Sequence, residues 1–528
     1  MSYVVVFVLS FALFLLYQAN SVFADPDSFY HVKMALLMRD QGVLQSFPWL
    51  GLTTLGEHFT NQHFLYHALL IPFVTALPPL IGMKLATVFF AAGFMTTFYW
   101  FLRTFGVRWP FLFFLLLLLS RPLTFRMSLA KAPSTSLLLL FLGLAFVFRF
   151  QLWRTALLAI TYVWYYGGFP LYLVVTGIYA VVSMVYNKIH RKPASHRLVE
   201  KAMSLIGRFR GRHSWSRNWA ILGVVLSGLV IGIVTHPNFP DNIHFYWQQL
   251  VNIGIINFQK TIGVGAEWYP YGFVALLTNT PFTSLVLLLS VIAIIFGAKH
   301  LTKQSISMIL MAIFFMLLTL KSRRYIEYYV PFAMAAGALT ISDAIRGTSG
   351  HTLVREIKRM FLESTWAKAV GVLLIIYLAS GIGFIAGRDV MGQVRDLKNG
   401  YPLTSYEKVG KWMTQHTPVG SRIVHSDWDE FPPLFYYNSH NTYIAGLDPT
   451  FLYIADKNIY WTWANLTLGR FSGDVYQAVT ETLQSKYVLV SQGHEAMRSL
   501  VVTDGRFHEI YRDAEVTVYA ANSAQSDE

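Results

Sequence analysis

The sequence has no cysteine among its 528 residues, and only 13% of the residues are charged. The lack of cysteine excludes disulfide bonds, thiolate metal sites and thiol catalysis. Hydrophobic residues, in contrast, make up 54% of the chain. This is not the composition of an ordinary soluble enzyme, because a chain this apolar needs a lipid bilayer as its solvent.

Apolar stretches long enough to cross a bilayer recur through the first three quarters of the chain. A transmembrane helix needs about 17 to 25 apolar residues. We predict a polytopic α-helical membrane protein with about eleven transmembrane helices, at about 2–23, 81–102, 109–120, 134–149, 153–167, 170–186, 219–236, 271–297, 303–320, 325–345 and 368–386. The first stretch has neither a basic leader nor a small-residue cleavage site, so we interpret it as a retained helix and not as a signal peptide.

The basic residues behind the net charge of +14 lie mostly in short connections between these stretches. Five basic connections alternate with the others along the chain, at 103–108, 149–154, 187–218, 297–303 and 346–368. The positive-inside rule places all five on the cytoplasmic side. Membrane topology and contact with membrane lipids explain this charge better than nucleic acid does, so no nucleic-acid partner is expected.

The order of the stretches predicts two domains. Residues 1–386 form the membrane domain, with a long first external loop at 24–80 and a second, mobile external loop at 237–270. The apolar run from Phe64 to Leu77 is too short to cross, which favours an interfacial or re-entrant helix. An odd number of helices then places residues 387–528 outside the cytoplasm, as a soluble α/β domain with short alternating runs. We expect the chain in the inner (plasma) membrane with this domain on its extracytoplasmic side.

Two carboxylates follow the first apolar stretch directly, at Asp25 and Asp27, with Tyr30 and His31 just beyond. A carboxylate this close to hydrocarbon is costly unless it binds a cation, a proton or a basic partner. The alternative is a helix cap, with Asp25 as N-cap and Pro26 at the first helical position. Both interpretations stay open on the sequence.

Charged residues also stand at two later external positions. Glu267 lies in the second external loop and follows Gly263 and Gly265. These glycines make the loop mobile, as an element that closes over a substrate must be. The simpler alternative is that Glu267 is a solvated loop carboxylate. Arg323 and Arg324 lie at the external end of a stretch, against the positive-inside bias, and guanidinium groups bind phosphate through paired hydrogen bonds. The alternative is that these arginines reach up to the lipid headgroups.

Acidic and aromatic residues alternate in the C-terminal domain, from Asp427 through Trp428 and Asp429 to Glu430. Rings stack on sugar faces and carboxylates accept from sugar hydroxyls, so this segment is a candidate acceptor site.

On the first external loop, His63 and His67 have a spacing that can share a metal. No third ligand is evident, and packing at the membrane interface is favoured.

In this order of elements the chain resembles the GT-C membrane glycosyltransferases, and in particular the catalytic subunit of oligosaccharyltransferase. The resemblance covers nearly the whole length. It implies that Asp25 binds a divalent metal, Mg or Mn, that Glu267 reaches the same site, and that Arg323 or Arg324 contacts the phosphate of a lipid-linked sugar. The acceptor motif of that family, Trp-Trp-Asp-Tyr-Gly, is matched only loosely by residues 427–430.

The sequence departs from that family at its second acidic motif. The corresponding segment, 121–134, has no carboxylate and carries Arg121, Arg126 and Lys131 instead. A metal ion therefore lacks expected ligands, and we hypothesise that one of these cations neutralises the donor phosphate in its place. The degenerate acceptor motif also argues against the usual Asn-X-Ser/Thr peptide, which leaves a glycan, a lipid or a protein as the acceptor.

The resemblance and the residues together predict a transferase. A sugar or oligosaccharide would pass from a polyprenyl-phosphate or polyprenyl-pyrophosphate donor to an acceptor on the extracytoplasmic face, with Asp25 taking the acceptor proton. Arg323, Arg324 and Lys131 would hold the donor phosphate. Asp27 and Glu267 would complete the catalytic site and help to position donor and acceptor. Tyr30 and His31 would bind the acceptor or the sugar together with residues 427–430. The alternative is a transporter or a lipid-linked sugar flippase, but such proteins place ionisable residues near the bilayer midplane, and the predicted spans are nearly free of charge.

Overall fold

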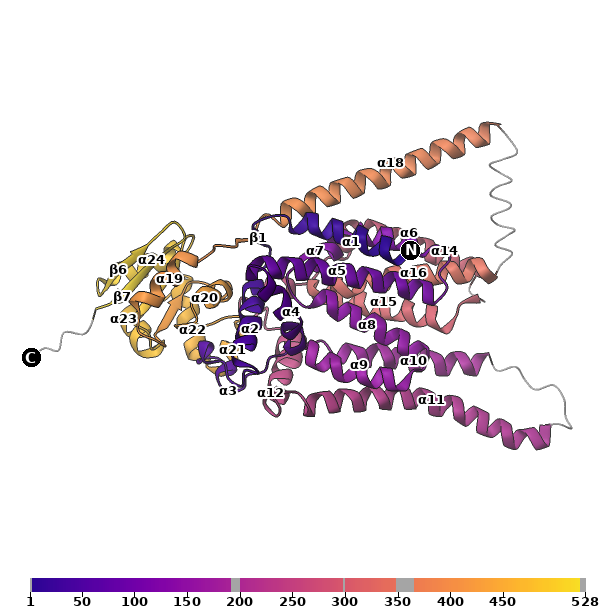
Figure 1. Ribbon diagram of the computed structural model, residues 1–528, viewed down its shortest axis with the longest axis horizontal. Helices are drawn as coiled ribbons and strands as arrows, with labels where there is room; N and C mark the ends of the chain where they lie inside the picture. The colour runs from indigo at the N-terminus through magenta and orange to yellow at the C-terminus, as the bar shows by residue number, and fades with distance from the viewer. Residues whose placement is uncertain (1, 191–199, 298–299, 348–364, 523–528) are drawn as a thin grey trace, which may run out of the picture.

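The computed structural model describes residues 2–190, 200–297, 300–347 and 365–522. A body of long helices and a smaller C-terminal domain lie end to end (Figure 1). The long helices and the bent segments of the body are α1 (Ser2–Gln18), α5 (Pro79–Thr104), α6 (Pro110–Leu118), α7 (Arg121–Ser128), α8 (Pro133–Phe148), α9 (Leu152–Tyr165), α10 (Pro170–Ile189), α11 (Glu200–Val234), α13 (Phe273–Asn279), α14 (Pro281–Gly297), α15 (Lys303–Lys321), α16 (Ile326–Gly347) and α18 (Thr365–Asp396).

Proline marks where many of these helices begin. It is the first residue of α5, α6, α8, α10 and α14. Its missing N–H is harmless at that position, because the first N–H groups of a helix have no partner within the helix. The predicted starts of α5, α6, α8 and α10 agree with the structure to within a few residues, whereas the span predicted from residue 271 reaches α14 only at Pro281.

Membrane-spanning length is shown for fewer helices than we predicted. Among the described residues, four helices are long and apolar enough to cross, at Pro79–Thr104, Pro170–Ile189, Arg217–Val234 and Lys303–Lys321, and two bent pairs would make six. The total of about eleven stays a prediction.

Three predicted spans differ in shape from a single straight helix. The first span, predicted to reach residue 23, ends at Gln18, and residues Val22–Phe23 form strand β1. The spans predicted at 109–120 and 271–297 belong to pairs bent by 68° between α6 and α7 and by 100° between α13 and α14. Proline explains both bends. Pro122 has no N–H to continue the helix of α6, and Pro281 disfavours helical geometry in Thr280 before it.

The first external loop is mostly helical. It contains α2 (Asp27–Gln41), the single turn η1 (Pro48–Leu50), α3 (Thr54–Glu57) and α4 (Phe64–Ala76). Helix α4 is the short helix predicted from Phe64 to Leu77. It meets α5 so closely that a Cβ on Gly82 would lie 2.2 Å from the carbonyl oxygen of Phe73, so only glycine fits there.

The second external loop is built from α12 (Asp241–Trp247), the π-helical segment η2 (Gln248–Ile256) and the single turn η3 (Ala266–Trp268). Its chain between η2 and η3 packs against the C-terminal domain: Ile262 is buried there, and the ring of Phe258 lies 5.3 Å from that of Tyr453. The glycine-containing loop is therefore docked on that domain in this structure.

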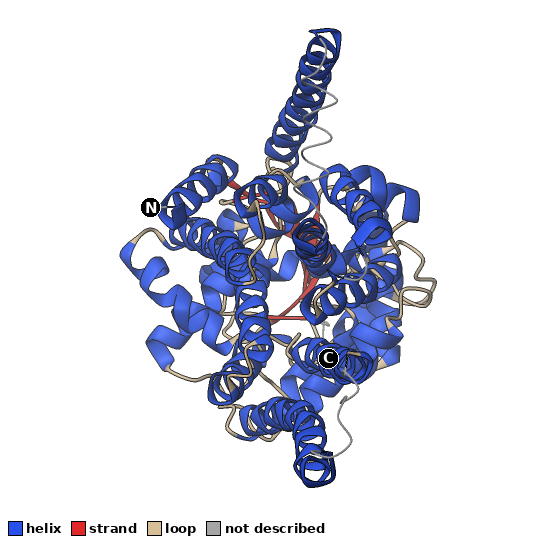
Figure 2. Cartoon of the chain, turned by 90° about the vertical axis from the view of Figure 1, so that its right-hand side faces the viewer, coloured by secondary structure: helices blue, strands red, loops and turns tan. Residues whose placement is uncertain are grey.

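The C-terminal domain has one five-stranded mixed sheet with strand order β4-β3-β5-β7-β6 (red in Figure 2). Strand β3 pairs in parallel with β4 and β5, whereas β7 is antiparallel to β5 and β6. The alternating runs predicted in this domain, at 486–491 and 515–520, form β5 and β7. The strands are β3 (Arg422–His425), β4 (Thr442–Tyr443), β5 (Tyr487–Ser491), β6 (Phe507–Arg512) and β7 (Val516–Ala521), and the helical elements are α19 (Glu407–His416), η6 (Trp428–Glu430), α20 (Phe431–Tyr437), α21 (Thr450–Ala455), α22 (Lys457–Thr467), α23 (Val475–Gln477), η7 (Ala478–Thr482) and α24 (Glu495–Asp504).

The body and the domain are joined through a two-stranded sheet and a cluster of rings. Strand β1 pairs antiparallel with β2 (Tyr401–Pro402), which follows α18. Helix α2 packs on α20, where the ring of Phe29 lies 5.8 Å from that of Tyr436. This junction brings the first external loop, the end of the last body helix and the C-terminal domain to one place.

Candidate functional site

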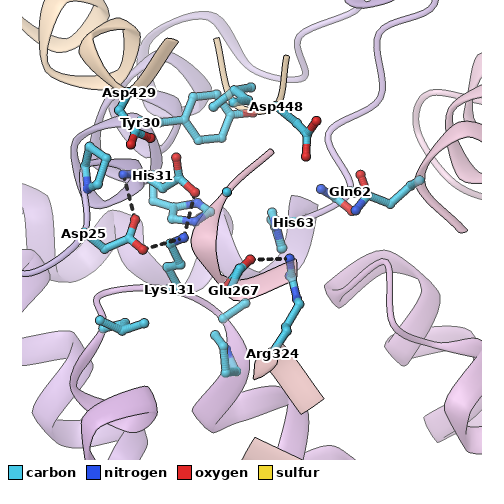
Figure 3. Close-up of a pocket in the computed structure, with 18 of the residues that line it drawn as sticks. Asp25, Tyr30, His31, Gln62, His63, Lys131, Glu267, Arg324, Asp429 and Asp448 are labelled. Atoms are coloured by element: carbon cyan, nitrogen blue, oxygen red, sulfur yellow. Dashed lines mark hydrogen bonds and ion pairs between the residues drawn. The ribbon is translucent and has the colours of Figure 1, made fainter. Parts of the chain in front are cut away.

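A pocket of about 400 Å³ lies at this junction. Its walls come from α2, from the segment between α7 and α8, from η3, from η5 (Arg323–Tyr325) and from the C-terminal domain (Figure 3). The charged side chains in the wall are Asp25, Asp27, Arg126, Lys131, Glu267, Arg324, Asp429 and Asp448. Segments far apart in the sequence thus bring their charges together at one end of the helical body.

Lys131 joins the two carboxylates that follow the first helix. Its Nζ lies 2.7 Å from an oxygen of Asp25 and 2.7 Å from an oxygen of Asp27. The other oxygen of Asp25 accepts from the backbone N–H of Asp27 at 3.0 Å, where α2 begins. Pro26, and not Asp25, is the N-cap residue of α2, but Asp25 accepts from the first N–H of the helix and also faces the pocket. Two carboxylates share one ammonium, which leaves one negative charge to act on a substrate.

Glu267 organises a second charge cluster on the other side of the pocket. One of its oxygens lies 2.7 Å from Arg324, and the other accepts from Arg126 at 2.8 Å. Arg126 also pairs at 2.7 Å with Glu327, which is fully buried. Arg324 donates in addition to the hydroxyl of Tyr166 at 3.1 Å. Glu267 is therefore a structural bridge between two arginines, a role its sequence context did not indicate.

Burial and neighbouring charges shift the pKa values of these groups in different directions. Burial raises the pKa of Asp27 to about 6, although Lys131 works against this shift. Burial raises the pKa of Asp429 to about 8, and the nearby charge of Asp427 adds to this effect. Burial also opposes ionisation of Glu267, but Arg324 and Arg126 outweigh it and hold the pKa of Glu267 well below its usual range. Near neutral pH, Asp429 is thus a proton-bearing acid, whereas Glu267 is an anion.

The predicted acceptor segment divides into residues inside and outside the pocket. Tyr30, His31, Trp428 and Asp429 line it. Asp427 does not, because its side chain accepts from the backbone N–H of Asp429 at 3.2 Å and caps η6. It therefore positions Asp429 instead of meeting a ligand itself.

Glu430, which we also placed in the acceptor site, is buried in the C-terminal domain. It accepts from the backbone N–H of Ser426 at 3.0 Å and from its hydroxyl at 2.7 Å. Three residues complete one turn of a 3₁₀ helix, so Asp429 and its neighbour Glu430 point in different directions. The prediction for Glu430 was wrong for this reason.

We expect Glu430→Ala to destabilise the domain by about 1–3 kcal/mol without changing the chemistry, because two buried donors of Ser426 lose their acceptor. Thermal unfolding of the purified chain, followed by tryptophan fluorescence, measures the loss. Glu430→Gln, which keeps an acceptor oxygen, should unfold closer to the wild type. Activity per folded molecule that falls as far in Glu430→Gln as in Asp429→Asn would contradict this assignment.

The two adjacent arginines also separate. Arg324 lines the pocket, and its guanidinium lies 5.0 Å from the centre of the Trp268 ring. Arg323 is exposed outside the pocket and donates to the carbonyl oxygen of Pro270 at 3.2 Å. The prediction that both arginines face the donor phosphate was therefore wrong for Arg323, again because a 3₁₀ turn points neighbouring side chains apart.

Among the cations considered as replacements for a metal, Arg121 lies outside the pocket and pairs with Asp396 at the end of α18.

The pair His63 and His67 does not form the metal site that its spacing allows. His67 instead hydrogen-bonds to Asn61 and to His31, each at 2.8 Å. Burial lowers the pKa of His31 well below its usual range, so these hydrogen-bonded side chains are neutral. The packing interpretation of the two histidines therefore fits their contacts.

The carboxylates at the start of α2 do not fit the divalent metal that the resemblance implies. Mg²⁺ and Mn²⁺ bind several oxygen ligands. Here the oxygens of Asp25 and Asp27 that point to a common centre are both taken by the ammonium of Lys131. The described residues also contain no group of three or more His, Cys, Asp or Glu side chains suited to a metal ion. No step of the chemistry below is therefore routed through a metal.

Several pocket residues were not among the predicted ones. Tyr166, Gln62, Gln249, Tyr401, Phe451 and Asp448 belong to this set. Asp448 had a sequence signal, because Asp448-Pro449 stands at the start of α21 just as Asp25-Pro26 stands at the start of α2. The other five are ordinary polar or aromatic residues, and only the fold places them in the wall.

No protein-family model and no curated protein matches the sequence. Solved structures do match. The archaeal oligosaccharyltransferase AglB from Archaeoglobus fulgidus, in complex with an inhibitory peptide and a dolichol-phosphate, is 13% identical with a TM-score of 0.62, over 100% of this chain and 75% of that one. ArnT from Cupriavidus metallidurans, bound to undecaprenyl phosphate, is 14% identical with a TM-score of 0.55, over 99% and 98%. The arabinofuranosyltransferase AftD from Mycobacteria is 10% identical with a TM-score of 0.59, over 99% of this chain and 40% of that one.

All three structures are GT-C membrane glycosyltransferases. At such low identity the likeness shows the fold, and the chain has the GT-C fold that the order of its elements predicted.

Proposed function

We propose that the protein is a membrane glycosyltransferase that moves a sugar from a polyprenyl-phosphate or polyprenyl-pyrophosphate donor to a hydroxyl-bearing acceptor. The observation that carries this proposal is the meeting of Asp25, Lys131, Glu267 and Arg324 in one pocket at the end of the helical body. The fold supports it, since AglB and ArnT were solved with dolichol-phosphate and undecaprenyl phosphate. A flippase would need ionisable groups along the membrane interior, whereas this cluster lies at one end of the helical body.

Arg324 is the side chain best placed to hold the donor phosphate. A guanidinium has five N–H groups, and within the described residues two of its nitrogens donate, one to Glu267 and one to Tyr166. The remaining donors face a pocket that also holds Arg126 and Lys131. Positive charge aimed at the leaving phosphate stabilises the transition state of transfer more than the ground state.

The Asp25 and Asp27 pair supplies the base. The acceptor oxygen forms a bond to the anomeric carbon of the sugar while the bond from that carbon to the phosphate oxygen breaks. The lipid phosphate leaves with the electron pair, and the acceptor proton passes to the carboxylate pair. One displacement of this kind inverts the anomeric centre and needs only one base.

The acceptor enters on the side of the C-terminal domain. Trp428, Tyr401 and Phe451 offer ring faces there, and Asp429 and Asp448 offer carboxyl groups. Rings against sugar faces and carboxyl groups on hydroxyls are the usual means of sugar recognition. We therefore favour a sugar hydroxyl as the acceptor. The protonated Asp429 donates to it and leaves the proton transfer to the Asp25 pair.

The test is transfer by the purified chain in liposomes that contain a radiolabelled polyprenyl-phosphate sugar and candidate glycan acceptors. Labelled product is expected with the wild type, and about a thousandfold less with the double variant Asp25→Asn and Asp27→Asn. Trp109→Phe, a conservative change at an exposed position outside the pocket, serves as the matched control. Movement of the donor across the bilayer without labelled product would favour the flippase instead.

Transfer is expected to fall as the pH drops through about 6, because the carboxylate pair must be unprotonated and the pKa of Asp27 lies near this value. The measurement is kcat/KM for the acceptor between about pH 5 and 8. The variant Asp27→Asn should lose this limb of the profile. A wild-type profile that is flat through this range would contradict the assignment.

A further inference from the structure

A second cavity, of about 280 Å³, lies at the other end of the helical body. Helix α8 connects the two sites: Pro133, its first residue, lines the pocket described above, and Phe148, its last, lines this cavity. At about 1.5 Å per residue, the 16 residues of α8 span about 24 Å. The second cavity therefore lies near the opposite face of the membrane from the candidate active site.

Three cations line this cavity, from three different parts of the chain: Arg149, Arg217 and Lys303. Among the residues that the structure describes, no carboxylate lines the cavity, and none forms an ion pair with these three side chains. Like charges gathered in one hollow repel each other and concentrate an anion there. The cavity thus has the charge of an anion site.

Aromatic rings hold these cations in place. Arg217 lies 4.4 Å from the centre of the Phe150 ring, and Lys303 lies 5.5 Å from that of Tyr179. Arg149 lies 5.9 Å from the ring centre of Trp100. A ring face attracts a cation but does not accept its N–H groups as an anion does. Within the described part of the chain no hydrogen bond engages the guanidinium groups of Arg149 and Arg217, so their N–H groups remain available to a ligand.

We propose that this cavity binds the phosphate headgroup of an anionic membrane phospholipid. The cavity is at a helix end, where headgroups lie, and α10 beside it leaves Val181, Val185 and Ile189 exposed at 58%, 52% and 71%. Apolar side chains in this position contact acyl chains, which a soluble phosphate does not have. Basic pockets between membrane helices bind lipid headgroups in this way. The site is separate from the proposed transfer chemistry and does not depend on it.

The experiment is lipid binding by the purified full chain in detergent, measured by native mass spectrometry with added phosphatidylglycerol or phosphatidylcholine. The triple variant Arg149→Gln, Arg217→Gln and Lys303→Gln is expected to bind phosphatidylglycerol on the order of 100-fold more weakly than the wild type, at about fivefold per cation. The matched control is Arg103→Gln, Arg154→Gln and Lys188→Gln. It removes three charges from the same end of the body, at exposed positions outside the cavity.

Three results would overturn the proposal. One is equal weakening by the two triple variants, which would mean diffuse surface charge. Another is wild-type affinity for phosphatidylcholine equal to that for phosphatidylglycerol. The third is displacement of phosphatidylglycerol by glycerol phosphate at similar concentration, which would identify a soluble phosphate ester as the ligand. Because binding is read without transfer activity, failure here leaves the proposed transferase untouched.

Discussion

The variant Lys131→Ala is expected to lose sugar transfer by a factor of about 1000, the largest effect of any single change in the pocket. Its ammonium lies 2.7 Å from both Asp25 and Asp27. Without it, two partly buried carboxylates face each other beside Asp429. Repulsion from Asp25, no longer opposed by the ammonium, raises the pKa of Asp27 further, so the pair holds a proton and cannot accept one from the acceptor. The donor phosphate also loses a cation. Transfer measured with a labelled polyprenyl-phosphate sugar gives the size of the loss.

Companion variants separate charge from shape at this position. Lys131→Arg keeps the cation and is expected to retain part of the activity, whereas Lys131→Met keeps most of the length and loses it. Adding Asp27→Asn to Lys131→Met should cost less than Asp27→Asn does alone, because the two residues act as a pair. We also expect the wild type to work in EDTA, since Lys131 supplies the positive charge between the two carboxylates. Full activity of Lys131→Met would refute this role.

The variant Arg324→Ala is expected to lower kcat/KM for the donor about 100-fold, as removal of a charged hydrogen-bond donor to phosphate does. Arg324 lines the pocket and points at Glu267 (Figure 3). In the variant, Glu267 keeps its contact with Arg126 at 2.8 Å, so the local fold has a remaining anchor. The measurement is initial rate against donor concentration at saturating acceptor.

The neighbouring residue provides the control for this prediction. Arg323 carries the same charge as Arg324 and lies in the same 3₁₀ turn, but its side chain is exposed outside the pocket. Arg323→Ala should therefore change kcat/KM by less than about twofold, since exposed charges contribute little. Arg324→Lys should recover only part of the loss, because an ammonium lacks the planar pair of donors. Equal losses in Arg323→Ala and Arg324→Ala would argue for a general attraction of the anionic donor instead of a specific contact.

Much of the candidate site was predictable from the sequence, for an energetic reason. A charged side chain beside a membrane-spanning helix is expensive to bury alone, so Asp25, Lys131 and Arg324 stood out against apolar surroundings. The structure places all three in one pocket. Glu430 and Arg323, which the structure places outside the pocket, are the neighbours of Asp429 and Arg324 in short 3₁₀ turns. Sequence position alone does not say which of two adjacent side chains faces inward there.

The sequence by itself determined that this chain needs a bilayer, since apolar content is a sum over residues and requires no coordinates. It also determined where several helices begin, because proline acts on its own backbone and that of its neighbour. Only the tertiary structure decided which charges meet: that Lys131 lies between Asp25 and Asp27, and that Glu267 bridges Arg126 and Arg324. Coulomb attraction and the penalty of burial depend on distances in space, and spacing along the chain does not contain those distances.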